Sequence, residues 1–373
     1  MPRRRHADDL RAASKLAVDA TKRVTALIQA MHKEIASGPT LLGRPLAPFA
    51  ELYTKIVYGS VSLTTSAVGV LVDALLEELA PLLGESELGD KREIVRAALN
   101  AVVGDYLQAV KNPLAIEMAM RVERASERML VLVHGSGMSD RQWLRHGHDH
   151  GAVLADALGC GRAYVHYNTG LHVSENGERL SEHLDALLCD EIVLIGYSMG
   201  GLVARAAIHA GKQAAWRRKL KVLVTIATPH HGAPLERGGS VVHALLGVHR
   251  YSAPIGRLAR VRSKGITDLR FGNVRKEDWQ DHDRFALRAD PRVPTPLPAD
   301  VACFAIAGTR SAAAEKRLHS DGLVPVKSAL GEHAAEERTL AFAKKAIVYG
   351  TNHLELLADT RVSEQVLAWL RGC

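Results

Sequence analysis

A serine flanked by two glycines directly follows a run of β-branched and apolar residues. Residues 191–200 read Glu-Ile-Val-Leu-Ile-Gly-Tyr-Ser-Met-Gly, which places Ser198 between Gly196 and Gly200. The next ten residues are strong helix formers, so the sequence predicts a sharp strand-to-helix turn at the serine. Such a turn strains the backbone and leaves no room for a neighbouring Cβ, which explains the two glycines. The pattern is typical of a nucleophilic serine facing the N-terminus of the following helix.

A nucleophilic serine needs a histidine base and an acid that orients it, and in doubly wound sheets these follow in the order serine, acid, histidine. Asp321 lies in the loop after a predicted strand at 301–307, and His353 follows the last predicted strand at 345–349. Other candidates are less well placed along the chain: Asp268, Asp278, Asp281, Asp283, Asp300, His319 and His333. The Asp321-Gly322 pair is also an ordinary turn signal. We predict Ser198, Asp321 and His353 as a catalytic triad.

An oxyanion hole is predicted where the first strand of the α/β region ends. The chain there reads His134-Gly135-Ser136-Gly137, and glycines allow the backbone to approach a substrate closely. We expect the amide of Met199 to be one donor and that of Ser136 the second. The amides of Gly137 and Met138 are close alternatives for the second donor. His134 is expected to be buried and to brace this loop.

The elements that must position these residues alternate along the second part of the chain. Short apolar runs predict strands at 129–133, 162–167, 191–195, 221–226, 301–307 and 345–349. Helical patterns occur at about 141–158, 175–189, 201–217 and 354–371. The alternation predicts an α/β fold with a doubly wound, mainly parallel sheet over residues 126–373.

A long insertion interrupts the alternation at about 230–298. Within 250–276 there are eight lysines and arginines against one acid, Asp268. An insertion between parallel strands usually lies over their carboxyl ends, so we interpret this segment as a basic lid. Its charge could favour anionic esters.

The first part of the chain, residues 1–125, reads as a helical region from about Leu10 to Arg124. The uncharged segment 56–72 is too short and too rich in serine and threonine for a good membrane span, so we expect a buried or interfacial helix. Basic residues outnumber acids in 1–36, which would allow peripheral contact with anionic lipid. A solvated helix face is the simpler alternative.

The composition is that of an ordinary globular protein. The chain has 373 residues, 47% hydrophobic and 24% charged, with a net charge of +7. No nucleic-acid motif accompanies this charge, so we expect a solvated basic surface and no nucleic-acid partner. The four cysteines lack metal-ligand spacing, and we expect buried free thiols and no metal or cofactor. No apolar segment follows the basic N-terminus, which predicts a cytoplasmic protein that could also contact the membrane peripherally.

Five motifs in order carry a family resemblance. They are Val-His-Gly-x-Gly at 133–137, Gly-Tyr-Ser-Met-Gly-Gly at 196–201, Ala-Thr-Pro-His-His-Gly-Ala-Pro at 227–234, Asp-Gly-Leu-Val-Pro at 321–325 and Asn-His-Leu-Glu-Leu at 352–356. From about Met129 onward the chain resembles the α/β-hydrolase superfamily, and within it bacterial lipases and esterases and the GPI inositol-deacylase type of hydrolase. The resemblance implies ester hydrolysis through an acyl-serine intermediate, and places the loop 228–232 near the acyl site. The long N-terminal region departs from the usual lipase pattern.

We therefore predict a serine hydrolase that cleaves carboxylic esters of acyl or lipid-like type. An acyltransferase would use the same triad, because only the acceptor in the second step differs. A protein that binds a membrane or a partner through a hydrolase scaffold is the non-enzymatic alternative. The sequence leaves open the substrate, its acyl chain length and the oligomeric state.

Overall fold

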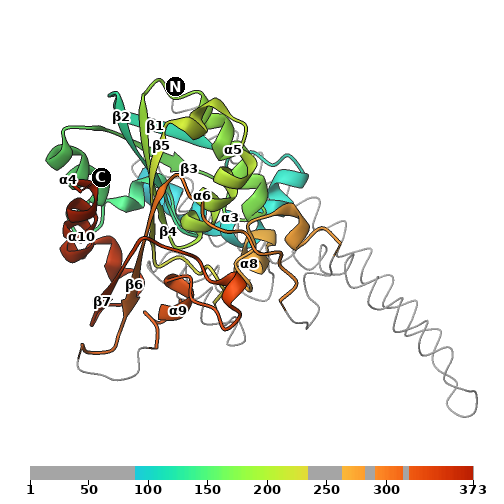
Figure 1. Ribbon diagram of the computed structural model, residues 1–373. Coiled ribbons are helices and arrows are strands. Elements are labelled where there is room, and N and C mark those ends of the chain that lie inside the picture. The colour runs from blue at the N-terminus through green and yellow to red at the C-terminus, as the bar shows by residue number, and fades with distance from the viewer. Residues whose placement is uncertain (1–88, 234–262, 282–289, 314–318, 373) are drawn as a thin grey trace, which may run out of the picture.

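A single seven-stranded sheet organises the computed structural model, which describes residues 89–233, 263–281, 290–313 and 319–372 (Figure 1). The strands are β1 (Ala119–Arg124), β2 (Arg128–Val133), β3 (Gly161–His166), β4 (Glu191–Tyr197), β5 (Leu220–Ile226), β6 (Ala302–Thr309) and β7 (Lys344–Tyr349). Their order across the sheet is β1-β3-β2-β4-β5-β6-β7. All neighbouring pairs are parallel except β1 with β3. The carboxyl ends of six strands therefore meet at one edge of the sheet.

Helices cover both faces of the sheet (Figure 1). One face carries α5 (Val173–Asp185) and α6 (Met199–Ala210), and the other carries α4 (His150–Leu158) and α10 (Thr360–Leu370). Shorter helices are α8 (Lys264–Asp268) and α9 (Val326–Ala329), with 3-10 turns at Asp140–Trp143, Ala215–Arg218, Lys276–Asp278, Glu336–Arg338 and Glu355–Leu357.

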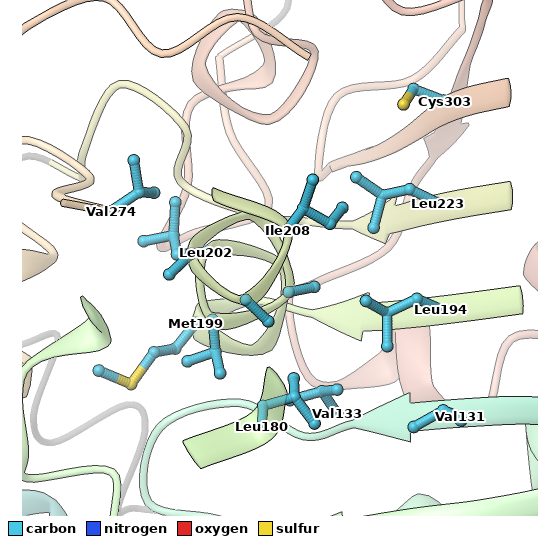
Figure 2. Close-up of a cluster of buried hydrophobic side chains, with 14 of the residues drawn as sticks. Val131, Val133, Leu180, Leu194, Met199, Leu202, Ile208, Leu223, Val274 and Cys303 are labelled. Carbon is cyan, nitrogen blue, oxygen red and sulfur yellow. The ribbon is translucent and has the colours of Figure 1, made fainter. Parts of the chain in front are cut away.

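Each face of the sheet has its own hydrophobic core. Figure 2 shows the first, in which α6 packs over the central strands. There Leu202 and Met199 of α6 lie in the same cluster as Leu194 of β4 and Leu180 of α5, all fully buried. The second core lies under α4 and α10 and includes Trp143 and Phe304. Burial on both faces explains why the strands are continuous apolar runs rather than alternating ones.

The predicted strands all occur in the structure, but two predictions from the helical patterns are wrong. The helical interpretation of the first region up to Arg124 fails at Ala119–Arg124, which forms β1 and pairs antiparallel with β3. This strand is exposed at the edge, so no apolar face identifies it in the sequence. The sheet thus begins before residue 126. The helix expected at 141–158 is instead a 3-10 turn at Asp140–Trp143 followed by α4.

The last helix of the N-terminal region, α3 (Gly89–Ala109), packs directly against the α/β domain. Asn168, which follows β3, donates its side-chain amide to the carbonyl of Gly104 at 2.9 Å. Ser263 of the insertion donates its hydroxyl to the carbonyl of Ala101 at 2.6 Å. The rest of the predicted N-terminal helices, the uncharged segment 56–72 and much of the insertion lie outside the described residues. None of the helices in the described ranges is long and apolar enough to cross a bilayer.

Candidate active site

The turn between β4 and α6 holds Ser198 in a strained conformation. Its φ is 51° and its ψ is −123°, a region that residues with a Cβ rarely adopt. A Cβ at Gly200 would lie 2.1 Å from the carbonyl oxygen of Val133, and one at Gly196 would lie 2.4 Å from the Cα of Gly201. Both glycines are therefore required by the close approach of neighbouring backbone. The sequence predicted this turn, and it predicted that steric crowding is the reason for the two glycines.

Ser198, His353 and Asp321 form a continuous chain of hydrogen bonds. The Ser198 Oγ lies 3.0 Å from the His353 Nε2, and the His353 Nδ1 lies 2.6 Å from the Asp321 Oδ2. All three residues are at most 4% exposed. This geometry allows the imidazole to accept a proton from the serine hydroxyl while the carboxylate fixes its orientation.

Further hydrogen bonds hold the acid and the histidine in place. The other oxygen of Asp321, Oδ1, accepts the backbone amides of Leu323 at 2.9 Å and Val324 at 2.8 Å. The backbone amide of His353 donates to the carbonyl of Asp321 at 2.9 Å. The hydroxyl of Tyr197 donates to the carbonyl of His353 at 2.6 Å. Burial, and then the charge of Asp321, raise the pKa of Tyr197 well above its usual value, so this residue stays a donor.

The loop after β2 lies against the serine. A Cβ at Gly135 would lie 3.1 Å from the Cβ of Ser198, so this loop packs directly against Ser198. The amide of Gly137 already donates to the hydroxyl of Thr169 at 3.2 Å. Because the Gly137 amide already has an acceptor, it is the weakest of the three candidates for the second oxyanion donor. The amides of Ser136 and Met138 are the better candidates.

His134 is packed within the same loop. Its ring stacks on that of Tyr167 with 4.4 Å between centroids, and its Nδ1 lies 2.8 Å from the carbonyl of Gly135. The hydroxyl of Tyr167 donates to the carbonyl of His134 at 2.7 Å. Burial lowers the pKa of His134 to about 3, and the adjacent His166 contributes to the shift. The imidazole is thus neutral at pH 7, and its contacts are with Gly135 and Tyr167 rather than with Ser198.

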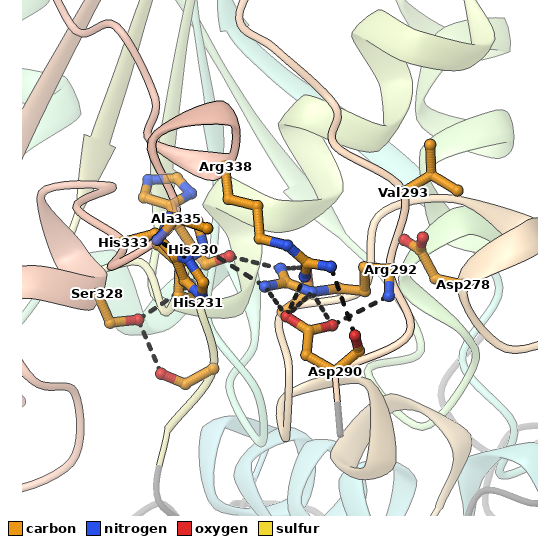
Figure 3. A network of polar contacts seen from close by, with 12 residues as sticks. His230, His231, Asp278, Asp290, Arg292, Val293, Ser328, His333, Ala335 and Arg338 are labelled. Atoms are coloured by element: carbon orange, nitrogen blue, oxygen red, sulfur yellow. Dashed lines mark hydrogen bonds and ion pairs between the residues drawn. The ribbon is translucent and has the colours of Figure 1, made fainter. Parts of the chain in front are cut away.

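The loop after β5, which contains the Thr-Pro-His-His-Gly motif, contacts the start of α6. A Cβ at Gly201 would lie 2.0 Å from the Oγ1 of Thr228. A network around Arg292 holds the rest of the loop (Figure 3). Arg292 binds the carboxylate of Asp290 and donates to the carbonyl of His230 at 2.8 Å. Burial lowers the pKa of His230 well below its usual value, so this residue is also neutral.

A second buried histidine–aspartate pair was not predicted. The Nδ1 of His172, which follows β3, lies 3.0 Å from the Oδ2 of Asp268 in α8. The sequence offered no signal that anything fixes Asp268, because its partner is 96 residues away. Thr169 was also missed, although its place just after β3 puts it at the sheet edge where the site lies. The competing acid Asp268 is thereby paired with a different histidine.

A match to a known protein family agrees with this fold. The model of the PGAP1-like alpha/beta domain family matches residues 181–296. No curated protein matches the chain.

Several solved structures are similar to it at low identity. A mature Bacillus licheniformis lipase is 16% identical, with 68% of this chain and 97% of that one covered and a TM-score of 0.42. A membrane phospholipase A, described as a bacterial virulence factor, is 17% identical, with 86% and 98% covered and a TM-score of 0.41. A Bacillus subtilis carboxylesterase is 14% identical, with 75% and 100% covered and a TM-score of 0.41. By its sheet, its ordered motifs and its family match, the chain resembles the α/β-hydrolase superfamily, as the sequence predicts.

Proposed function

We propose that the protein is a serine hydrolase that cleaves carboxylic esters through an acyl-Ser198 intermediate. The observation that carries the proposal is the hydrogen-bonded chain from Ser198 through His353 to Asp321 at the carboxyl edge of the sheet. The strained backbone of Ser198 supports it, because strain of this kind is retained where function requires it.

In the first half-reaction, the Ser198 Oγ attacks the ester carbonyl carbon, and its proton passes to the Nε2 of His353. The amides of Met199 and Ser136 are the proposed donors to the oxyanion, and losing one such donor typically costs about 3 kcal/mol of transition-state stabilisation. Collapse of the tetrahedral intermediate breaks the bond to the alcohol. The leaving alkoxide takes the proton from His353, and the acyl group remains on Ser198.

In the second half-reaction, water attacks the acyl-serine and gives a proton to His353. The carboxylic acid leaves as Ser198 regains its proton, so the residues return to their initial state. An acyltransferase would differ only here, with an alcohol or thiol in place of water. Measuring transfer to an added alcohol alongside hydrolysis distinguishes the two activities.

The test of the proposal is a comparison of Ser198→Ala with Ser126→Ala. Ser126 lies between β1 and β2, at the opposite edge of the sheet from Ser198. We expect Ser198→Ala to abolish hydrolysis of p-nitrophenyl acyl esters and labelling by a fluorophosphonate probe, with an unchanged circular dichroism spectrum. Ser126→Ala should keep both activities. Retained turnover or labelling in Ser198→Ala would overturn the assignment.

The proposed substrate is an acyl or lipid-like ester. The proposed location of the protein is the cytoplasm, with peripheral contact to the membrane. The motifs shared with lipases and esterases support the substrate class. The segments proposed to touch a membrane lie outside the described residues, so a binding experiment must test them. Co-sedimentation with anionic liposomes, for the full chain and for a variant with the basic residues of 1–36 replaced by glutamine, would do so. Equal binding of the two would contradict a membrane role for this segment.

A further inference from the structure

A cavity of about 390 Å³ lies along α6, away from the serine. Its basic lining comes from separate elements: Arg205, His209 and Lys212 in and just after α6, Arg217 before β5, and Arg275 of the insertion. The segment Pro294–Pro298 forms an apolar wall together with Ile208. Asp300 is the acidic residue of the lining. Cavities of this size with an apolar wall and converging polar groups are typical of small-molecule sites.

Arg205 is the most deeply buried of these cations, at 6% exposed. Its guanidinium donates to the carbonyl of Thr295 at 2.7 Å and lies 3.3 Å from the Nδ1 of His230. Both acceptors are neutral, and no carboxylate among the described residues lies within ion-pairing distance of it. Burial and the charge of Arg292 lower the pKa of Arg205 to about 10, although Asp278 acts in the opposite direction. A buried cation without a charged partner is costly, and an anion in the cavity would relieve that cost.

The other cations keep the cavity positive. Arg217 and Arg275 are paired with Asp300 and Glu277, but these carboxylates are 71% and 57% exposed and so are strongly solvated. One guanidinium nitrogen of Arg217, Nη1, is buried and has no hydrogen-bond partner. Burial and the charges of Lys212 and Arg275 lower the pKa of His209. The positive potential of both cations therefore reaches the His209 side of the cavity.

The cavity is separate from the hydrolytic site. Ser198 precedes the first residue of α6, whereas His209 lies near its last turn. At the helical rise of about 1.5 Å per residue, His209 lies about 16 Å from Ser198 along the helix axis, and Arg205, the nearest lining residue of α6, lies about 10 Å from it. Because α6 runs away from the carboxyl edge of the sheet, the cavity lies toward the opposite edge.

We propose that this cavity binds a small phosphate monoester whose apolar part lies against the proline-rich segment. Guanidinium groups from separate elements can surround a doubly charged tetrahedral group and donate several charge-assisted hydrogen bonds to it. The monoester could be a free molecule or the headgroup of a lipid, and both present the same phosphate. The binding does not depend on the chemistry at Ser198.

Calorimetric titration of the full chain carrying Ser198→Ala tests the proposal without turnover. The probes are phenyl phosphate, phenol as the uncharged control, and inorganic phosphate. We expect phenyl phosphate to bind with one-to-one stoichiometry and more tightly than inorganic phosphate, and phenol to show no binding. Equal binding of phenol and phenyl phosphate would overturn the proposal.

A pair of variants locates the binding. The double variant Lys212→Ala/Arg275→Ala should weaken phenyl phosphate binding at least about tenfold, because each charge-assisted contact is typically worth that much or more. Arg218→Ala removes an exposed cation next to Arg217 that does not line the cavity, and its affinity should stay within about twofold of the parent. An equal loss in both variants would show general electrostatics and overturn the proposal.

Vesicles distinguish the two sources of the phosphate. The chain is sedimented with phosphatidylcholine vesicles that contain phosphatidic acid, with and without phenyl phosphate. If the protein sediments with the vesicles, and both added phenyl phosphate and the double variant abolish this sedimentation, the ligand is a lipid headgroup. If the protein binds phenyl phosphate but does not sediment, the ligand is a free monoester. If the double variant still sediments with the vesicles and the protein does not bind phenyl phosphate, the cavity is not the binding site and the proposal is wrong.

Discussion

The domain contains two buried histidine–aspartate pairs, which differ in the group that contacts the rest of each imidazole ring. In both, the histidine Nδ1 contacts a carboxylate, at 2.6 Å for His353 and Asp321 and at 3.0 Å for His172 and Asp268. Both carboxylates also accept backbone amides. The second nitrogen of His353 meets the hydroxyl of Ser198. The ring of His172 instead stacks on Trp279, with 3.7 Å between centroids.

The comparison shows that a histidine–aspartate pair alone does not identify a base. Only the His353 pair has a hydroxyl beside its second ring nitrogen, as the proposed mechanism requires. Asp268 also accepts the side chain of Asn273 and the amide of Val173. These bonds tie α8 of the insertion to the start of α5. No hydroxyl of the described chain hydrogen-bonds to the Nε2 of His172. We interpret the His172 pair as a tether that holds the insertion on the sheet domain.

Replacing the two histidines should give the largest contrast. We expect His353→Gln to lower kcat by roughly 10⁴- to 10⁶-fold, because the serine loses its base. His172→Gln should change kcat by less than about tenfold, since it touches no reacting group. Steady-state hydrolysis of a p-nitrophenyl ester measures both. If kcat fell by a similar factor in both variants, the two histidines could not be assigned different roles.

Replacing the two acids separates activity from stability. Asp321→Asn should lower kcat by roughly 10⁴-fold with little loss of fold, because the imidazole loses its orienting charge. Asp268→Asn should instead destabilise the fold by about 1–3 kcal/mol, because a buried charged hydrogen bond is lost. Thermal unfolding is measured beside kcat. The assignment fails if Asp268→Asn is as inactive as Asp321→Asn at a temperature where both are folded.

Acid should affect a buried histidine that lacks a carboxylate partner. The Nε2 of His150 lies 2.8 Å from the carbonyl of Leu356, and burial lowers the pKa of His150 from 6.5 to about 4. The folded state then binds fewer protons than the unfolded state, so stability is retained above pH 6.5 and lost as the pH falls toward 4. The loss attributable to this group is about 3 kcal/mol.

Urea unfolding at pH 7.5 and pH 4.5 measures that loss. His150→Gln should show a smaller difference between the two pH values than the parent protein, whereas His319→Gln, which replaces an exposed histidine, should not change it. An unchanged difference in His150→Gln would contradict the prediction.

The smallest effect is expected at Thr169, which positions the loop beside Ser198. Thr169→Val leaves the amide of Gly137 without its acceptor, so the loop should shift slightly. We expect kcat to fall about tenfold with KM nearly unchanged, because the loop acts on the transition state. Thr169→Ser keeps the hydroxyl and should restore most of the activity. A drop of equal size in Thr169→Ser would point to packing rather than to the hydrogen bond.

The strands that carry the candidate site and the turn at Ser198 could be predicted because they obey local rules. The apolar runs identified β2 through β7, since strands buried on both faces carry no polar alternation. The glycines around Ser198 follow from steric crowding within a few residues of the chain. The edge strand β1 was not readable, because its side chains are mostly exposed and only pairing with β3 defines it.

The sequence alone determined which residue types could serve as nucleophile, acid and base, and in what order along the chain, because these follow from chemistry and from the ends of recognisable strands. Asp321 and His353 each follow a predicted strand, which is why the sequence could propose them as partners. Only the tertiary structure decided that Asp268 of the insertion joins His172 against the ring of Trp279. That pair depends on the packing of segments 96 residues apart, and no local pattern encodes it.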